Sequence, residues 1–257
     1  MGALFQPQRI VGKTRNLWNA SARRLLRNAP IQLCQNSLAL SPSVDRVSTS
    51  KMKRICVVTS CSRAYYSLVS RLRMAGIPFA SLVPSSNCPQ CDLVLTTCAE
   101  AGDYGSRAVF VEELDDNPFV FKGQILSRLT NAKETLLMGV DPGTRIGMAV
   151  YYGNANLEYV TFDSVNGLRA GVTSFIRKVP AKKKVVRIGN GNRALAMAIA
   201  LSLMNEVSYA IVEVVDEAGT SARSVGMKGV QGDQRAAARI AFRRGVVLTR
   251  PNPRTSA

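Results

Sequence analysis

Hydrophobic and polar positions in the second half of the chain follow a pattern that changes from element to element. An apolar run over 136–140 ends on Asp141, a Pro142-Gly143-Thr144 corner follows, and a second apolar run covers 146–152. Two such runs around a tight corner predict a β-hairpin whose first strand ends in a carboxylate. An ordinary Asp-Pro-Gly turn would give the same letters, so the interpretation depends on the rest of the chain.

The pattern after the hairpin predicts three more strands and three helices. The expected strands are 157–163, 185–189 and 209–215, and the expected helices are 166–178, 193–205 and 233–244. A loop rich in Gly and Ser separates the last strand from the last helix. The order β-β-β-α-β-α-β-α predicts an α/β domain over residues 135–250 with a mixed five-stranded sheet.

Residues 52–134 carry their own, shorter pattern. It predicts strands and helices in the order 55–59, 62–75, 79–83, 93–97, 108–112 and 120–131. Strand, helix, strand in this order predicts a small parallel, Rossmann-like α/β domain. No Gly-x-Gly-x-x-Gly sequence follows its first strand, so a dinucleotide is not indicated, and partner binding or substrate positioning is the default expectation.

Residues 1–51 differ from the rest in composition, with 8 Lys/Arg and 1 acidic residue. Two interpretations stay open. They are an organellar transit peptide, which would place the protein in mitochondria, or an extension upstream of a functional start at Met52, which favours the cytoplasm. In both cases we expect a disordered extension outside the fold, like the tail at 251–257.

Charge is distributed unevenly over a chain whose net charge is +17. Residues 135–257 hold 17 Lys/Arg against 8 acids, whereas residues 52–134 hold 9 against 8. A basic domain beside a nearly neutral one favours a polyanionic partner for the basic domain. No apolar run approaches the ~18–20 residues that span a bilayer, so no membrane partner is expected.

Histidine is absent, which excludes histidine bases, histidine metal ligands and histidine triads. Of the six cysteines, only Cys88-Pro-Gln-Cys91 has the spacing of a metal or redox motif, and no second pair accompanies it. We therefore expect reduced, structural thiols and not a zinc site.

Acidic residues lie where several predicted elements begin or end. Asp141 ends the first strand, Asp216 and Glu217 follow the last strand, and Asp233 opens the last helix. Carboxylates that converge repel one another unless a cation lies between them, and their oxygens suit Mg²⁺ or Mn²⁺. Two such ions could support phosphodiester hydrolysis without histidine. A helix-dipole acid at 233 and a solvated loop at 216–217 are the plainer explanations.

Three stretches resemble the RuvC/YqgF branch of the RNase H-like superfamily, in the family's order. The first is Gly139-Val-Asp141-Pro-Gly143-Thr-Arg-Ile-Gly147-Met-Ala, similar to the opening hairpin. The second, Val215-Asp216-Glu217-Ala-Gly-Thr220-Ser, is similar to the Asp-Glu-x-x-Thr-Thr element after the fifth strand. The third, Asp233-Gln-Arg-Ala236-Ala237-Ala-Arg-Ile240, is similar to the terminal Asp-x-x-Ala-Ala helix. The resemblance covers residues 135–248 and is closest to an archaeal form with an added N-terminal α/β domain.

The resemblance implies a metal-dependent endonuclease that acts on branched DNA, as a Holliday-junction resolvase does in recombination and repair, or on structured RNA. It implies Asp141, Glu217 and Asp233 as catalytic metal ligands, with Asp216 as a further ligand. One departure concerns Gly189-Asn190-Gly191, which is neutral where many of these nucleases carry an acid at the end of the fourth strand. A nucleic-acid-binding module that has lost catalysis is therefore the alternative.

Basic residues near these acids are the candidate nucleic-acid contacts. They are Arg145, Lys182, Lys183, Lys184, Arg223, Lys228, Arg235, Arg239 and Arg243. The last three recur every four residues and predict a helix stripe directed away from Asp233. We expect this stripe and Lys182–Lys184 to flank the acids and bind phosphates. A solvated helix face would give the same stripe. The sequence leaves a homodimer open.

A phosphotransferase of the actin and sugar-kinase superfamily is a third, weaker interpretation. Its first strand also ends in an Asp-x-Gly-Thr-like turn, but that fold needs two such domains and a Gly-Gly adenosine motif. The chain offers a single Asp-x-Gly turn of this kind within 257 residues.

Overall fold

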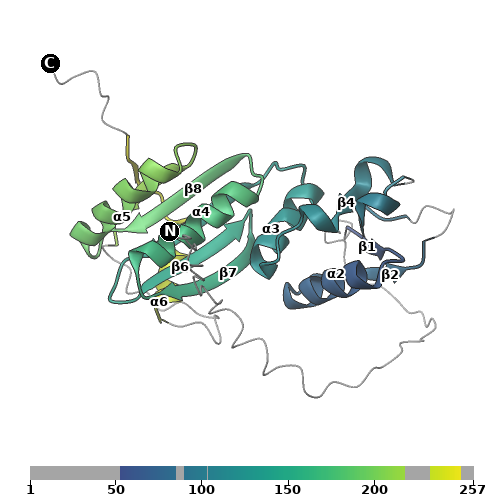
Figure 1. The fold of residues 1–257 in the computed structure, drawn as a ribbon. Coiled ribbons are helices and arrows are strands. Elements are labelled where there is room, and N and C mark those ends of the chain that lie inside the picture. The colour runs from purple at the N-terminus through teal and green to yellow at the C-terminus, as the bar shows by residue number, and fades with distance from the viewer. Residues whose placement is uncertain (1–52, 85–89, 103, 218–231, 250–257) are drawn as a thin grey trace, which may run out of the picture. The chain divides into compact units, whose positions relative to one another are not determined.

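The structure, a computed structural model, describes residues 53–84, 90–102, 104–217 and 232–249. These residues belong to one compact unit that spans Ser50–Ala257. They form an α/β fold with two separate sheets (Figure 1). The extension at 1–51 and the tail at 251–257 lie outside the described residues. Within the described ranges, no helix has both the length and the apolar character that a membrane span requires.

The first sheet is parallel, as the sequence predicts, and its strands lie in the order β2-β1-β3-β4. The strands are β1 (Ile55–Val58), β2 (Ala80–Leu82), β3 (Leu93–Thr96) and β4 (Ala108–Phe110), and the helices are α2 (Ser62–Met74) and α3 (Pro118–Leu129). Three short 3-10 turns lie between β3 and α3, at Cys98–Glu100, Gly105–Arg107 and Val111–Glu113. Leu68 and Leu72 of α2 join the same buried cluster as Phe121 and Ile125 of α3, so both helices cover one face of this sheet.

A disulfide joins Cys56 of β1 to Cys91, with 6.1 Å between their Cα atoms. The expectation of reduced thiols is therefore wrong for this pair. The two residues meet only because β1 and β3 run side by side, with Ile55 opposite Leu93, and cysteine spacing does not reveal such a pairing. Cys61 and Cys98 are free and exposed, and Cys34 and Cys88 lie outside the described residues.

The second sheet is mixed, with the strand order β10-β9-β8-β5-β6-β7. Its strands are β5 (Thr135–Asp141), β6 (Ile146–Tyr152), β7 (Ala155–Phe162), β8 (Lys183–Gly189), β9 (Ile211–Val215) and β10 (Val246–Val247). Its helices are α4 (Val165–Lys178), α5 (Arg193–Glu206) and α6 (Gly232–Phe242). The element order agrees with the prediction except for β10, whose two residues pair with Val214 and Glu213. A two-residue strand is too short to leave a hydrophobic period, so the sheet has six strands instead of the expected five.

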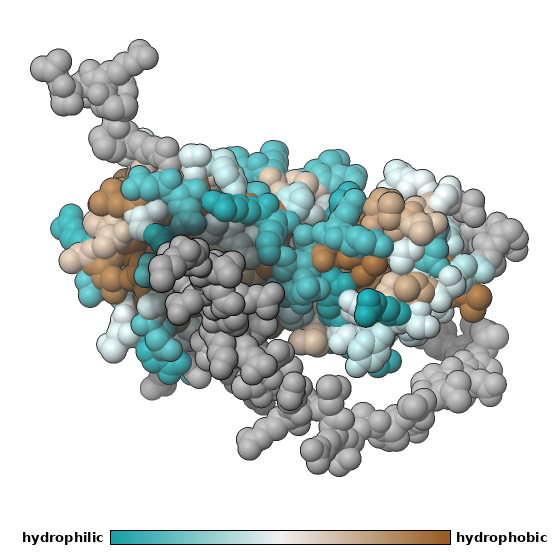
Figure 2. Space-filling view, in the orientation of Figure 1, coloured by the Kyte–Doolittle hydropathy of each residue, from teal (hydrophilic) through white to brown (hydrophobic). Residues whose placement is uncertain are grey.

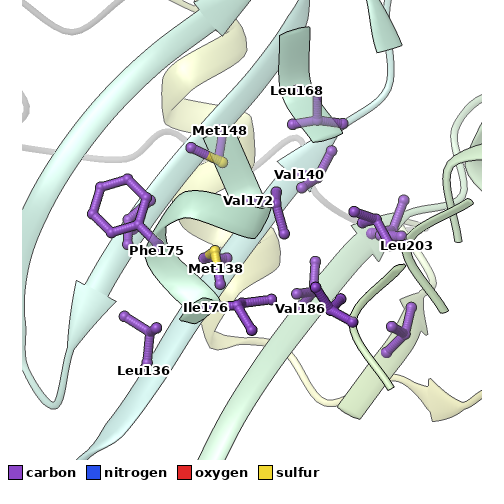
Figure 3. Packing of buried hydrophobic residues seen from close by; sticks show 14 of the residues in the cluster. Leu136, Met138, Val140, Met148, Leu168, Val172, Phe175, Ile176, Val186 and Leu203 are labelled. Carbon is purple, nitrogen blue, oxygen red and sulfur yellow. The ribbon is translucent and has the colours of Figure 1, made fainter. Parts of the chain in front are cut away.

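The helices cover opposite faces of this sheet. Leu136, Met138 and Val140 of β5 pack with residues of α4 and α5, such as Val172 and Leu203 (Figure 3). Leu137, on the other face, packs with the alanines of α6. Because successive side chains of a strand point to opposite faces, Asp141 lies on the α6 face with Leu137 and Gly139. The fold thus directs the candidate carboxylate toward the helix that opens with Asp233.

Helix α6 lies unusually close to the sheet. A Cβ atom on Gly139 would be 2.0 Å from the carbonyl oxygen of Ala237, and one on Gly147 would be 2.3 Å from the carbonyl oxygen of Asp233. No side chain fits at either position, so the helix backbone rests directly on β5 and β6. The buried face of α6 is itself mostly alanine, which allows the same close contact.

The C-terminal end of α6 is tied to the sheet by a largely buried ion pair. Arg187 Nε of β8 donates to Glu213 Oε2 of β9 at 2.8 Å, and Arg187 Nη1 donates to the carbonyl oxygen of Ala241 at 2.7 Å. The N–H of Gly245 donates to the same Glu213 oxygen at 3.2 Å. Arg187 therefore satisfies a carbonyl that the helix end would leave unpaired. Gly147 at the start of α6, Gly139 along its second half and Arg187 at its end therefore fix the helix on the sheet.

Candidate active site at the end of the second sheet

Asp141 is the last residue of β5 and pairs with Gly147 of β6. Its side chain is partly buried, and burial is the largest cause that raises the pKa of Asp141 to about 6. The negative charges of Glu217 and Asp233 raise this pKa further, while the positive charge of Arg239 opposes them. A carboxyl group surrounded in this way holds a proton, or a cation, more tightly than one in water.

Glu217 reaches this corner of the sheet from β9. Its backbone N–H donates to Asn190 Oδ1 at 3.1 Å, and the N–H of Gly191 donates to Glu217 Oε1 at 3.0 Å. A Cβ atom on Gly189 would lie 2.0 Å from that same Oε1 atom. The carboxylate of Glu217 is therefore held over the end of β8, the strand between β9 and β5.

Asp233 lies in the first turn of α6, where the helix dipole favours a negative charge. Its backbone rests on Gly147, which is the pairing partner of Asp141. The structure thus brings Asp141, Glu217 and Asp233 together on the α6 face at one end of the sheet. Asp216 is exposed beside them, and its carbonyl oxygen accepts a hydrogen bond from Arg243 Nη1 at 3.1 Å.

The donor chemistry of this corner fits a divalent metal, because carboxylate oxygens are the ligands that Mg²⁺ and Mn²⁺ prefer. The mutual repulsion recorded in the raised pKa of Asp141 fits a cation as well. The distances fit less closely. Among the described residues, no group of three acidic or cysteine side chains lies close enough to hold one ion as it stands. Shared coordination would therefore require the carboxylates to move closer together.

Of the arginines expected to form an outward stripe on α6, only Arg235 is exposed. Arg239 is partly buried and its charge acts on Asp141, and Arg243 bonds to Asp216. The expectation that all three point away from the acids is wrong for Arg239 and Arg243. At 3.6 residues per turn, each step of four residues rotates by about 40°, so the stripe turns toward β9 along the helix.

The lysines 182–184 lie at the opposite end of the sheet from the acids. Lys183 pairs with Thr135, the first residue of β5, so Asp141 lies six residues further along that strand, roughly 20 Å away. The expectation that these lysines flank the acids is therefore wrong. Lys184 is also engaged within the fold, because its Nζ donates to the carbonyl oxygen of Ile176 at 2.5 Å and lies over the ring of Tyr209. Burial lowers the pKa of Lys184.

Two of the remaining basic candidates, Arg223 and Lys228, lie outside the described residues. Arg145 is described and exposed in the turn after Asp141, where its Nε lies 3.9 Å from Asp163 Oδ1. Arg145 and Arg235 are thus the exposed arginines among the described candidates.

The first sheet also carries a carboxylate near the end of a strand. Glu100 follows β3 and accepts hydrogen bonds from the hydroxyls of Thr59, Ser60 and Thr97 and from the N–H of Ser60. Desolvation alone would raise its pKa, but these donors outweigh it and lower the pKa of Glu100 to about 2. Sequence reasoning missed this network because its donors come from two segments about 40 residues apart.

Sequence reasoning also missed the roles of Asn190, Gly191 and Arg239 around the acids. The run Gly189-Asn190-Gly191 was visible as an interruption at a strand end, but its contact with Glu217 depends on the pairing of β8 with β9. No protein-family model and no curated protein matches this chain.

Proposed function

We propose that this protein is a metal-dependent nuclease of the RNase H-like type, which hydrolyses phosphodiester bonds in branched DNA or structured RNA. The observation that carries the proposal is the convergence of Asp141, Glu217 and Asp233 on one face at one end of the sheet, near enough for the charges of Glu217 and Asp233 to raise the pKa of Asp141. The strand arrangement supports it. An antiparallel β5-β6-β7 meander is extended by parallel strands β8 and β9, in keeping with the resemblance in the motifs.

In this proposal Asp141, Glu217 and Asp233 hold Mg²⁺ or Mn²⁺, with Asp216 adjacent as a further oxygen donor. The bound cation would supply Lewis-acid stabilisation of charge at the phosphate. The chain's own contribution is to gather the carboxylates in a partly desolvated corner, and to offer Arg145 and Arg235 for phosphate contacts. Arg239 offsets part of the acid charge while no cation is bound.

A second candidate function is nucleic-acid binding without catalysis. Two observations favour it. The described acids are not close enough to hold an ion as they stand, and the end of β8 is neutral. Arg239 would then act as a permanent counterion in a retained but inactive fold.

An activity screen separates the two candidates. The protein and its Asp141→Asn variant, purified in parallel, are incubated with labelled four-way junctions, duplexes and structured RNA in Mg²⁺, Mn²⁺ or EDTA. Binding to the same substrates is measured by anisotropy. Metal-dependent cleavage that the variant lacks supports the nuclease. Binding of equal strength in metal and EDTA, without cleavage, supports the second candidate. If the protein neither cleaves nor binds these substrates, both candidate functions are refuted.

A further inference from the structure

The segment Gly189-Asn190-Gly191 contacts Glu217 through both its side chain and its backbone. We propose that these three residues form a seat that positions the Glu217 carboxylate next to Asp141, in the place of the acid that β8 lacks. The inference rests on the proposed function, in which Glu217 is a metal ligand. Whether Gly189, Asn190 and Gly191 position Glu217 can be tested separately from nuclease activity.

The position of residue 189 explains why a seat is useful. Strand β8 pairs in parallel with β5, and Ile188 lies opposite Val140. An acid at position 189 would therefore be a direct neighbour of Asp141. Gly189 has no side chain, and Glu217 Oε1 lies 2.0 Å from where its Cβ atom would be. The Glu217 carboxylate thus occupies the volume that the side chain of residue 189 would fill.

Two hydrogen bonds fix the glutamate in this volume. The Asn190 side chain accepts the N–H of Glu217, and the N–H of Gly191 donates to Glu217 Oε1. The Asn190 backbone N–H is itself bonded to the carbonyl oxygen of Val215, at 3.0 Å. The seat is therefore anchored to β9 immediately before the glutamate that it holds.

The residue types match this role. Alanine at 189 would force the carboxylate to move, and alanine at 191 would place its Cβ atom 3.1 Å from Glu217 Oε2. Asn190 supplies a neutral acceptor for the Glu217 N–H without adding charge beside Asp141. Gly189, Asn190 and Gly191 are positioning residues, because they act on Glu217 and not on a substrate.

A double-mutant cycle tests the seat. Gly189→Ala is made in the wild type and in the Glu217→Gln and Glu217→Ala backgrounds, and thermal unfolding and Mn²⁺ binding are measured for each. We expect Gly189→Ala to lower Tm in the wild type and in Glu217→Gln, which keeps the shape of the side chain. In Glu217→Ala the loss should be smaller, because the clash with the carboxylate is gone and only the approach to Ile240 Cδ1, at 2.6 Å, remains. A contact between the new Cβ atom and Ile240 Cδ1 is common to all backgrounds and cancels.

Mn²⁺ titration gives the second readout. Gly189→Ala should weaken Mn²⁺ binding at least about tenfold in the wild type and change it little in the Glu217→Ala background. Gly191→Ala brings its Cβ atom less close to Glu217 and should weaken Mn²⁺ binding less. It replaces Gly189→Ala in the test if that variant does not fold. Gly102→Ala is the matched control, because a Cβ atom there meets nothing within 4 Å and both measurements should stay unchanged.

The outcomes separate the seat from the proposed function. An equal loss of Tm in the Glu217→Ala background would overturn the seat, since Gly189 would then act through the fold alone. Failure of the wild type to bind Mn²⁺ would count against the nuclease, while the Tm cycle would still decide whether Glu217 is held by Gly189. For Gly191→Ala, an equal loss of Tm with and without the Glu217 side chain would likewise reject the seat.

Discussion

Glu100 and Asp141 occupy similar places in two different sheets, yet their surroundings are opposite. Glu100 follows β3 and is stabilised as an anion by hydroxyl and N–H donors, which lower its pKa to about 2 despite desolvation. Asp141 ends β5, and its pKa is raised to about 6 by burial and then by the charges of Glu217 and Asp233. Hydrogen-bond donors of the protein stabilise the negative charge of Glu100, whereas burial and neighbouring acids destabilise that of Asp141.

The difference separates a structural acid from a candidate functional one. A carboxylate with a full set of donors connects the two segments that it bonds and gains little from a cation. A carboxylate whose anion is disfavoured by its neighbours gains from any cation that enters. Position at a strand end is thus insufficient to identify a site, and the neighbouring charges and donors decide.

The largest expected effect is that of Asp141→Asn on the proposed activity. Metal-dependent cleavage should fall by at least about 100-fold, since even groups that only support a metal ligand can contribute 10–100-fold. The same change should stabilise the metal-free protein by about 1–3 kcal/mol at pH 8, because it removes a disfavoured charge. Cleavage assays and denaturant unfolding measure the two effects.

The pH dependence of that stabilisation follows from the raised pKa of Asp141. The folded state binds the Asp141 proton more tightly than the unfolded state. The stability that Asp141 contributes is therefore fully present below its ordinary pKa near 4 and is lost as pH rises through about 6. The two proteins should therefore match at pH 3 and diverge toward pH 8. A variant that is less stable at every pH would contradict this account of the site.

Glu158 sharpens the comparison, because its pKa is raised to about 7 by burial without neighbouring acids. Its side chain in β7 is 5% exposed. Glu158→Gln should stabilise the protein by roughly 3 kcal/mol at pH 8, with the difference vanishing below pH 4. Saturating Mn²⁺ should shift the pH profile of the wild type relative to Asp141→Asn but leave the Glu158→Gln difference unchanged. If Mn²⁺ changed the stability difference for Glu158→Gln as much as that for Asp141→Asn, the metal would not be acting through the acidic neighbours of Asp141.

Glu100→Gln should have the opposite sign. Because the folded-state pKa of Glu100 is lowered, its stabilisation is present above the ordinary pKa near 4.5 and is lost as pH falls through about 2. The variant should lose about 1–2 kcal/mol at pH 7 through weakened hydrogen bonds to a charged group, and the gap should close toward pH 2. Asp163→Asn, at a side chain that is 93% exposed, is the neutral control for unfolding experiments. A Glu100→Gln protein as stable as the wild type at pH 7 would show that the donors do not favour the anion.

The smallest expected effect compares the two ends of the second sheet. If nucleic acid binds at the acid end, Arg235→Ala should reduce the slope of log K against log salt by about 0.9 for a duplex. Lys183→Ala, at the far end of β8, should leave the slope unchanged. A salt titration by anisotropy measures both. Should Lys183→Ala flatten the slope and Arg235→Ala have no effect, the binding surface would lie at the lysine end.

Hydrophobic periodicity was sufficient for the α/β fold class and for the sequence order of the strands and α-helices, with β10 as the exception. The apolar runs around Pro142-Gly143-Thr144 predicted the hairpin and the position of Asp141, and the structure confirms both. The order of residues could also have placed Lys182–Lys184 correctly, since they lie at the start of a strand parallel to the one that Asp141 ends. That inference needs the direction of the strand, which hydrophobic periodicity does not report.

Other features could not be predicted, because they depend on which strands are neighbours. The contact of Glu217 with Gly189, the approach of Arg239 to Asp141 and the Cys56–Cys91 disulfide all join residues that are distant in the chain. Hydropathy reports which face of an element is buried and does not report what lies opposite.

The apolar surface of the protein is likewise uneven. Figure 2 shows hydrophobic residues gathered over α5, whose outer side carries Met197 and Leu201 at 37% and 50% exposure. Although the helix is apolar over most of its length, this side is open to solvent.

The close approach of α6 to the sheet has a consequence for how the chain tolerates mutation. At Gly139 and Gly147 even a single methyl group would meet helix backbone, which cannot rotate aside as a side chain can. In a saturation-mutagenesis library these two positions should therefore reject every replacement, as severely as the largest residues of the core do. At Gly102 and Gly232, where a methyl group would meet no atom of the described residues within 4 Å, most replacements should survive. A map of tolerated residues would then trace the footprint of α6 without any measurement of activity.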